Sequence, residues 1–549
     1  MNKGRFFAII AAALLAGGVA KAQSTSGLLF DRDIISNSSL ISLSQRNYMG
    51  TARSMAMGGA FTSLGADMAS FGVNPAGFGM YQRNEISATL GLGLIEATNK
   101  GAINSSNYNN TTRFSINNLG ASFLVYEDTG ALTAINFAFG YNKTADYNYD
   151  FSYRSNPTVS SMADAFADIA NREGLGINDN NKICDQKGYA NYDMNPYFWT
   201  TALAYKGGLI NRGANGWYPD ELGNGASMTQ HTRLNSRGAA SEFSFATGMN
   251  FSNIVYFGMT LDIQSISRKQ TVYYGEDIAY PAGVPSGADL PYQLVESELG
   301  QTTEVSGSGV GAKFGVVVRP VKGLRIGLAL HTPTYYSVLY RYKAALKSKT
   351  LNAGSNPDNF TVSDDGYIYA DESTPVLEDL GRNRWKFRTP TRLLAGISYT
   401  VGNYLVISTD YMYEAFGGIR IVESPIDSDF INESFRNGIR GRHTVCGGIE
   451  AKIVPAVALR AGGGYSSRIV NAEYIFGEPV LNNKWYLSAG IGFRLGRVTS
   501  IDIAYQYNKE QYTDYYSFFS ENSLGVNSSP RYGLELTRHN LAVTFGFKF

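Results

Sequence analysis

The sequence predicts an all-β protein, a 14-stranded antiparallel transmembrane β-barrel. Three observations lead to this fold class. Only 17% of the 549 residues are charged, while glycine and tyrosine are abundant, at 60 and 37 residues. Apolar residues alternate with small or polar residues in many segments of about 10 residues. The connections between these segments are short and long in turn, which is the layout of a bacterial outer-membrane barrel.

The first 22 residues are expected to lie outside the fold. Lys3 and Arg5 form a basic start, residues 6–19 are apolar, and residues 20–22 (Ala-Lys-Ala) match a signal-peptidase site. We predict that this segment is a cleaved signal peptide, because its apolar run is shorter than the roughly 20 residues of a spanning helix. Its removal takes three positive charges from a net charge of +1 and leaves about −2. This balance, without a basic patch, argues against nucleic-acid binding.

The rest of the chain has no apolar run long enough for a spanning helix, and the mean hydropathy of the whole sequence is −0.17. A barrel strand shows only alternate residues to lipid, so a low average is compatible with a barrel. The last strand is the clearest example, because Phe545, Phe547 and Phe549 alternate with Gly546 and Lys548. An aromatic carboxy-terminal residue resembles the signal that outer-membrane barrels present to their assembly machinery, which is therefore an expected partner.

Fourteen segments carry the alternation. They start near Ile86, Arg113, Leu132, Ser241, Ile254, Ser306, Gly323, Phe387, Tyr404, Gly441, Ala456, Trp485, Thr499 and Gly533. The long connections run over about 98–112, 142–240, 272–305, 345–386, 419–440, 472–484 and 508–532. A soluble β-sandwich alternates too, so the even strand number and the loop lengths decide for the barrel. Both termini are then expected in the periplasm. Residues 197–206 also alternate, but a fifteenth strand would break the even number, so we predict an extracellular extension.

The segment from residue 23 to residue 84 differs in composition from the strands. It is rich in Ser, Gly, Ala and Met, and its most distinctive residues are Arg53, Met57, Gly58, Gly59, Ala60, Asp67 and the tetrapeptide Asn74-Pro75-Ala76-Gly77. This pattern resembles the amino-terminal plug of the FadL-type transporters of long-chain fatty acids and hydrocarbons. Residues 311–320 with 324–333 resemble that family's mid-barrel hairpin, and residues 387–390 its continuation. The resemblance covers nearly the whole mature chain.

The resemblance implies a plug, residues 23–84, inside a barrel of residues 85–549. It also implies extracellular capture of amphipathic molecules, which pass the plug by passive diffusion and leave sideways through a gap in the wall. Glycines such as Gly58 and Gly59 would let the plug kink. Pro75 fixes one torsion and biases Asn74 to an extended backbone. The alternative for the tetrapeptide from Asn74 to Gly77 is an ordinary tight turn before the first strand.

Inward-facing charges are the candidate binding residues. Four cations could anchor a fatty-acid carboxylate through a charge-assisted hydrogen bond: Lys313, Arg325, Arg460 and Arg494. The opposing carboxylates are Asp262, Asp410, Glu450 and Asp502. For any single cation, we expect a place in a charge-neutralising network that holds the plug more than a role as a carboxylate anchor.

The longest loop, residues 142–240, is expected to lie outside the membrane and to contain a short helix at residues 161–171. Its apolar residues could line a capture groove or pack into a core of the loop itself. They are Met162, Phe166, Ile169, Phe198, Trp199 and Trp217.

No catalytic or metal-binding constellation is visible, so we expect neither an enzyme nor a cofactor. The four histidines have no metal-ligand spacing: His231, His331, His443 and His539. Residues 178–181 are too incomplete for a calcium loop. For Cys184 and Cys446, a disulfide after export and two free thiols remain equally open.

Three function classes follow. The first is a monomeric outer-membrane transporter whose partners are membrane lipid and a hydrophobic ligand such as a long-chain fatty acid. The second is a scaffold or shuttle in protein secretion, and the third is a surface adhesin or receptor. Uptake of labelled oleate and co-purifying lipid would support the first class. Export of surface proteins would support the second, and binding of a host protein by the loops would support the third.

Overall fold

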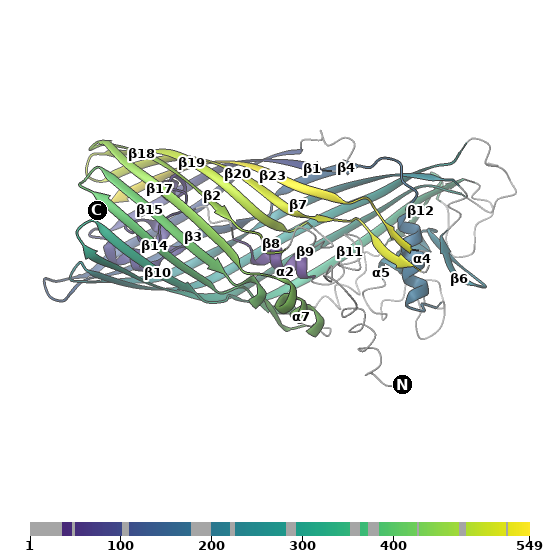
Figure 1. The fold of residues 1–549 in the computed structure, drawn as a ribbon, viewed down its shortest axis with the longest axis horizontal. Helices are drawn as coiled ribbons and strands as arrows, with labels where there is room; N and C mark the ends of the chain where they lie inside the picture. Colours follow the sequence, from purple (N-terminus) through teal and green to yellow (C-terminus); the bar gives the residue numbers. More distant parts are fainter. Residues whose placement is uncertain are drawn as a thin grey trace.

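A computed structural model describes residues 36–46, 50–100, 109–176, 199–219, 225–281, 293–351, 363–371, 384–424, 428–470, 479–522 and 525–549. Its strands close into an antiparallel barrel, because the first strand pairs with the last from Glu85↔Lys548 to Lys100↔Gly533. Figure 1 shows the barrel with the carboxyl terminus at one end and the loop helices at the other. The predicted fold class, a 14-stranded antiparallel barrel, is confirmed.

Some of the 14 barrel strands are interrupted, so that two successive segments form one strand. The barrel strands are β1 (Glu85–Lys100), β2 (Asn109–Glu127), β3 (Leu132–Asp146), β7 (Ser227–Phe251), β8 (Val255–Ala279), β9 (Gln293–Val321), β10 (Leu324–His331) with β11 (Tyr335–Leu351), β13 (Arg384–Arg388) with β14 (Arg392–Val401), β15 (Leu405–Glu414) with β16 (Arg420–Glu423), β17 (Arg442–Val454), β18 (Val457–Ser466), β19 (Leu481–Leu495), β20 (Thr499–Tyr515) and β23 (Tyr532–Lys548). Pro333 and Pro390 lie at two of the interruptions, where a missing N–H breaks the ladder. There Thr334 N donates to Thr389 Oγ1 (2.9 Å) and Thr389 N to Thr334 O (3.0 Å), which keeps the wall joined.

The outer wall is apolar at the level of the bilayer. The exposed side chains include Leu92, Phe139, Leu261, Leu328 and Phe545, each on a different strand. A continuous apolar surface of this kind would aggregate in water and is stable in lipid. The inward residues of the same strands are small or polar. The protein is therefore an outer-membrane type of barrel.

Strands β7 to β9 are longer than the sequence predicted. β7 begins at Ser227 and β9 at Gln293, whereas starts near Ser241 and Ser306 were expected. The 25 residues of β8 span roughly 80 Å at about 3.3 Å per residue, far more than a bilayer requires. Beyond the bilayer the pattern inverts, with Ser267 outward and Ile266 buried inside. This inversion hid the extensions, because the prediction looked for apolar residues on the outside.

The remaining elements lie inside the barrel or at its loop end. Inside are α2 (Asn37–Ser44), α3 (Ala52–Ala56), η1 (Met68–Phe71) and η2 (Pro75–Met80). Two further strands extend the wall, β4 (Tyr149–Arg154), which pairs with β7, and β12 (Tyr367–Asp371), which pairs with β11. The elements at the loop end are α4 (Met162–Arg172), α5 (Trp199–Lys206), β5 (Ile210–Gly213), β6 (Gly216–Pro219), η5 (Phe416–Gly418), α7 (Asp429–Gly438), β21 (Phe519–Asn522) and β22 (Gly525–Ser528). In the described part of the chain, no helix has both the length and the hydrophobicity to span a bilayer.

Two loop predictions can be compared with these elements. The helix predicted at residues 161–171 is α4, and Ser161 Oγ caps it by accepting from Ala163 N. The alternation at residues 197–206 belongs to helix α5 instead of an extended segment. Residues 200–204 are all buried, the apolar and the hydroxyl side chains alike. The alternation in this segment therefore does not separate an outward face from an inward face.

Candidate functional site

Residues 50–84 form a hatch that crosses the lumen. Its helix α3 packs against β19 and β20, while η2 packs against β7, β8 and β9. These strands lie on opposite sides of the ring, so the hatch spans the barrel from wall to wall. The chain then enters the wall directly, as β1 begins at Glu85.

Asn74 fixes the turn at the start of η2. Its Oδ1 accepts from Ala76 N (3.0 Å), and its Nδ2 donates to Thr62 O (2.6 Å) within the hatch and to Leu328 O (3.3 Å) on the wall. Gly77 is confined as well, because a Cβ there would lie 2.2 Å from Ser70 Oγ. The predicted tetrapeptide is thus a buried element of the hatch.

Gly58 and Gly59 follow α3, and both have positive φ, at 65° and 77°. A Cβ on Gly58 would lie 2.6 Å from Gly463 N and 2.7 Å from Gly447 O, whereas one on Gly59 would meet nothing within 4 Å. Gly58 therefore lies in close contact with strands β17 and β18.

Two of the predicted lumen cations hold the hatch to the wall. Lys313 Nζ donates to Phe71 O of the hatch (2.7 Å) and pairs with Glu242 (2.8 Å) and Asp262 (3.1 Å). Its side chain is 2% exposed, and a charge buried this deeply requires such partners.

Arg460 belongs to a second cluster, in which Glu450 bridges the wall and the hatch. Arg460 pairs with Glu450 and with Asp502, both at 2.6 Å, and Glu450 also pairs with Arg53 of the hatch (2.9 Å). Asp410, the fourth predicted carboxylate, accepts from the hatch amide Thr62 N (2.7 Å). These contacts have the geometry of the neutralising network.

The other two predicted cations lie on the opposite side of the hatch from the loops. Arg325 and Arg494 line a cavity at the short-turn end of the barrel, which we call the vestibule. Arg460 lines the same cavity, whereas Lys313 does not, so three of the four predicted anchors share one site.

A second cavity lies above the hatch, and we call it the chamber. Its volume is about 170 Å³, and hatch residues Ser54, Gly58 and Val73 line one side of it. Its charged lining residues are Arg46, Asp146, Glu242, Arg392, Asp410, Glu414, Arg442, Lys484, Glu510 and Arg538. Several are paired, with distances of 3.1 Å for Arg46–Glu242, 2.7 Å for Arg392–Glu414 and 2.9 Å for Arg538–Glu510.

Arg442 differs from these paired cations. Its side chain donates to Leu481 O (2.8 Å), and its guanidinium lies 4.8 Å from the ring centre of Phe416. Arg442 is 3% exposed, and its Nε has no hydrogen-bond partner. Within the described ranges, no carboxylate lies within 4.0 Å of its nitrogens. Glu414 lies opposite Arg442 in the strand pairing, but its ion pair is with Arg392. A buried guanidinium that lines a cavity and has no ion pair of its own is suited to bind an anion.

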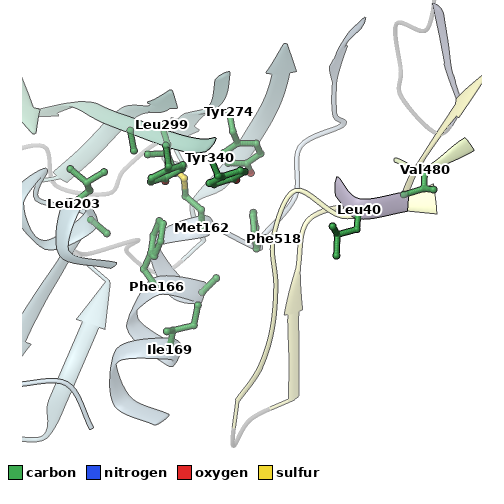
Figure 2. Close-up of a cluster of buried hydrophobic side chains, with 14 of the residues drawn as sticks. Leu40, Met162, Phe166, Ile169, Leu203, Tyr274, Leu299, Tyr340, Val480 and Phe518 are labelled. Atoms are coloured by element: carbon green, nitrogen blue, oxygen red, sulfur yellow. The ribbon is translucent and has the colours of Figure 1, made fainter. Parts of the chain in front are cut away.

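An apolar cap closes the loop end of the lumen. Met162 and Phe166 of α4 are completely buried and point toward Leu299 and Tyr340 of the wall, as Figure 2 shows. Leu40 of α2 belongs to the same cluster. Glu276 of β8 accepts hydrogen bonds from Met162 N (2.9 Å) and Ser161 Oγ (2.6 Å), which fixes the start of α4. The chamber therefore lies between an apolar cap and the hatch.

The loop residues proposed for a capture groove pack mainly into this cap. Ile169 is buried, and Trp217 Nε1 donates to Leu175 O (2.8 Å). These contacts correspond to the self-packed alternative. Phe198 lies outside the described residues, as does the side chain of Trp199.

The remaining polar candidates form no reactive centre. His331 is buried and its Nε2 hydrogen-bonds with Val73 O (2.8 Å), so it supports the hatch. No group of three metal-ligating side chains occurs in the ranges that the structure describes. Cys446 is a free thiol in β17, whereas Cys184 and residues 1–35 lie outside the described part.

The sequence reasoning missed Arg442 and Lys484. Lys484 was assigned to a loop, but β19 already begins at Leu481. Arg442 is the first residue of β17, at the very edge of the predicted strand. Continuing the inward alternation toward the loop end of these two strands would have placed both side chains in the lumen.

Comparison with known proteins found matches only among solved structures. No protein-family model matches the chain, and no curated protein matches it. The channel CymD, described as a monoaromatic hydrocarbon channel, is 12% identical, with 92% of this chain and 99% of that chain covered and a TM-score of 0.47. A Pseudomonas aeruginosa FadL homologue is 11% identical, with 91% and 98% covered and a TM-score of 0.48. The Pseudomonas putida toluene transporter TodX is 12% identical, with 92% and 100% covered and a TM-score of 0.45.

These matches are FadL-type channels, the family whose plug and hairpin motifs the sequence resembles. With TM-scores below 0.5, they add no argument about the site, and the fold assignment rests on the pairing of the strands described above. The protein is a 14-stranded outer-membrane β-barrel closed by an internal hatch, and it resembles the FadL-type channels.

Proposed function

We propose that this protein transports hydrophobic or amphipathic small molecules across the outer membrane, with long-chain fatty acids as the first candidates. The observation that carries the proposal is the chamber, which is lined by the buried guanidinium of Arg442, a group that forms no ion pair among the described residues. A carboxylate bound there would form charge-assisted hydrogen bonds in a site shielded from water. The matched solved structures, described as hydrocarbon channels and a FadL homologue, are consistent with such cargo.

Passage requires motion of the cap or the hatch. The chamber, at about 170 Å³, is smaller than the roughly 300 Å³ at which small-molecule sites usually begin. It can hold a headgroup and the start of a chain, and the rest of a long chain needs space that α2 or the hatch now fills. Plug-gated passive diffusion after extracellular capture fits this arrangement.

Sideways release has one structural candidate. An apolar groove of about 620 Å³ on the outer wall is lined by Phe314, Leu328 and Leu393, and Leu394 borders both this groove and the chamber. β10 pairs with β9 and β14 along its length, so release here would require these strands to part. Arg325 and Arg494 lie beyond the hatch. They remain predicted carboxylate anchors for cargo that has already passed it.

The test compares oleate with oleyl alcohol, which has the same chain without the charge. The variant Arg442→Gln is expected to bind oleate about tenfold more weakly, the loss of one charge-assisted hydrogen bond, and to bind oleyl alcohol as before. Arg442→Lys keeps the charge and should retain part of the oleate affinity. Binding is measured with the purified protein, and native mass spectrometry identifies lipid that co-purifies.

Two results would contradict the proposal. One is equal loss of both ligands in Arg442→Gln, which would mean that the residue only supports the fold. The other is unchanged oleate uptake in cells that lack the protein, together with lost export of surface proteins, which would favour the role as a secretion scaffold.

A further inference from the structure

The vestibule is the larger of the two lumen cavities described here. Its volume is about 720 Å³. Hatch residues Arg53 and Asp67 line its inner side, and the β17–β18 turn at Pro455 and the β19–β20 turn at Gly496 line its mouth. It therefore opens at the short-turn end of the barrel, the end that carries Phe549 (Figure 1).

The carboxylates of the vestibule are all engaged by three cations. Glu450 and Asp502 pair with Arg460 (both 2.6 Å), Glu450 and Asp67 pair with Arg53 (2.9 and 3.9 Å), and Glu85 pairs with Lys548 (3.2 Å). Five further cations line the same cavity: Arg83, Arg325, Lys452, Arg494 and Arg497. None of the five has a carboxylate within 4.0 Å among the residues that the structure describes.

These five cations surround the mouth instead of forming a single point. Arg325 lies on β10, Lys452 on β17, Arg494 on β19, Arg497 in the β19–β20 turn, and Arg83 just before β1. In the order of strands around the barrel, this arc covers more than half of the circumference. A single carboxylate cannot reach all of them. Like charges gathered without counter-charges repel one another, and a ligand with several negative charges would relieve that repulsion.

We propose that the vestibule binds an acidic segment of a soluble polypeptide. A flat membrane surface cannot enter a cavity inside the barrel, whereas an extended peptide can. Arginine forks bind carboxylates in a bidentate manner, and clusters of arginine are a general means of recognising acidic motifs. In the predicted orientation the partner is periplasmic. The inference goes beyond the transport proposal, because binding of the peptide requires no passage of cargo.

The test uses the full-length protein in a neutral detergent and a fluorescent oligo-glutamate peptide of about ten residues, read by anisotropy. The double variant Lys452→Gln/Arg497→Gln is expected to bind about tenfold more weakly, and affinity should fall with salt. The matched control is Arg319→Gln/Lys322→Gln, which removes two cations near the same end that do not line the vestibule. It is expected to bind as the unchanged protein does. Heat-modifiable migration on a gel confirms that each variant is folded.

Three results would overturn the inference. The first is no binding of oligo-glutamate to the unchanged protein. The second is an equal loss in both double variants, which would indicate only a general surface charge. The third is full displacement of the peptide by inorganic phosphate at an equal concentration of charge, which would indicate a site for small anions.

Discussion

Cations in the lumen fall into two groups, according to whether a carboxylate reaches them. Lys313 and Arg460 each contact two carboxylates and are buried, so removing one partner would leave an uncompensated charge. Their role is to hold the hatch. Arg442 is also buried but forms no ion pair among the described residues, and this difference makes it the candidate for ligand binding. The inward direction of Lys313 and Arg460 could be predicted from alternation, but the presence or absence of a partner could not, because the partners come from other strands and from the hatch.

Two adjacent glycines allow a residue-scale prediction about the hatch. Gly58→Ala is expected to push the hatch away from β17 and β18, because its Cβ would lie 2.6 Å from Gly463 N. The expected result is a higher ion conductance of the protein in planar bilayers. Gly59→Ala is the matched control, since it has a similar φ but free space, and only a backbone strain of about 1–2 kcal/mol applies. Equal conductance of the two variants would show that the close contact at Gly58 does not seal the lumen against ions.

The element that closes the loop end is α4, and its docking depends on a carboxyl group. Asp164 lies in the first turn of α4, and burial together with the neighbouring Asp168 raises its pKa to about 6. Its ordinary value is 3.8, so between pH 4 and 6 the docked helix holds a proton that a released helix lacks. Docking is therefore strengthened as the pH falls from about 6 to about 4, and the contribution of Asp164 no longer changes with pH above about 6.

We accordingly expect α4 to be more protected from hydrogen exchange at about pH 5 than at about pH 7.5, after correction for the intrinsic exchange rate. Asp164→Asn should reduce this difference by raising the protection at the higher pH. Asp364→Asn, at an exposed turn residue, is the control and should keep the whole difference. The difference that remains in Asp164→Asn belongs to Glu276, which binds the start of α4 and whose pKa is raised by burial to about 7. An unchanged difference in Asp164→Asn would contradict the role of Asp164.

Helix α4 and strand β8 also show how far sequence patterns reach at the level of elements. The helix was found because its N-cap and apolar residues are local features. The end of β8, residues 272–279, was placed in a connection because the environment changes along the strand, from lipid outside to water outside. No local sequence pattern predicts at which residue of a strand the bilayer ends.

The whole molecule is stable only with its apolar belt in lipid. Leu541→Arg, at an outward position midway along β23, is expected to lower the free energy of unfolding by about 2–4 kcal/mol in lipid vesicles. Ser267→Arg, outward on the extension of β8, is the matched control and should have little effect. Urea titration followed by tryptophan fluorescence measures both. A similar loss in both variants would contradict the position of the bilayer inferred here.

The barrel, its 14 strands and the residues that turn inward follow from the order of the amino acids, because a period of two and the loop lengths are properties of the chain alone. The same order marks Asn74 and its neighbours as a separate element. The neutralised charges become known only from the folded barrel, as does the finding that Arg442 and the five vestibule cations form no ion pair among the described residues. The reason is that an ion pair in a barrel joins residues hundreds of positions apart, such as Arg53 and Glu450, whose proximity arises only when the wall closes around the hatch.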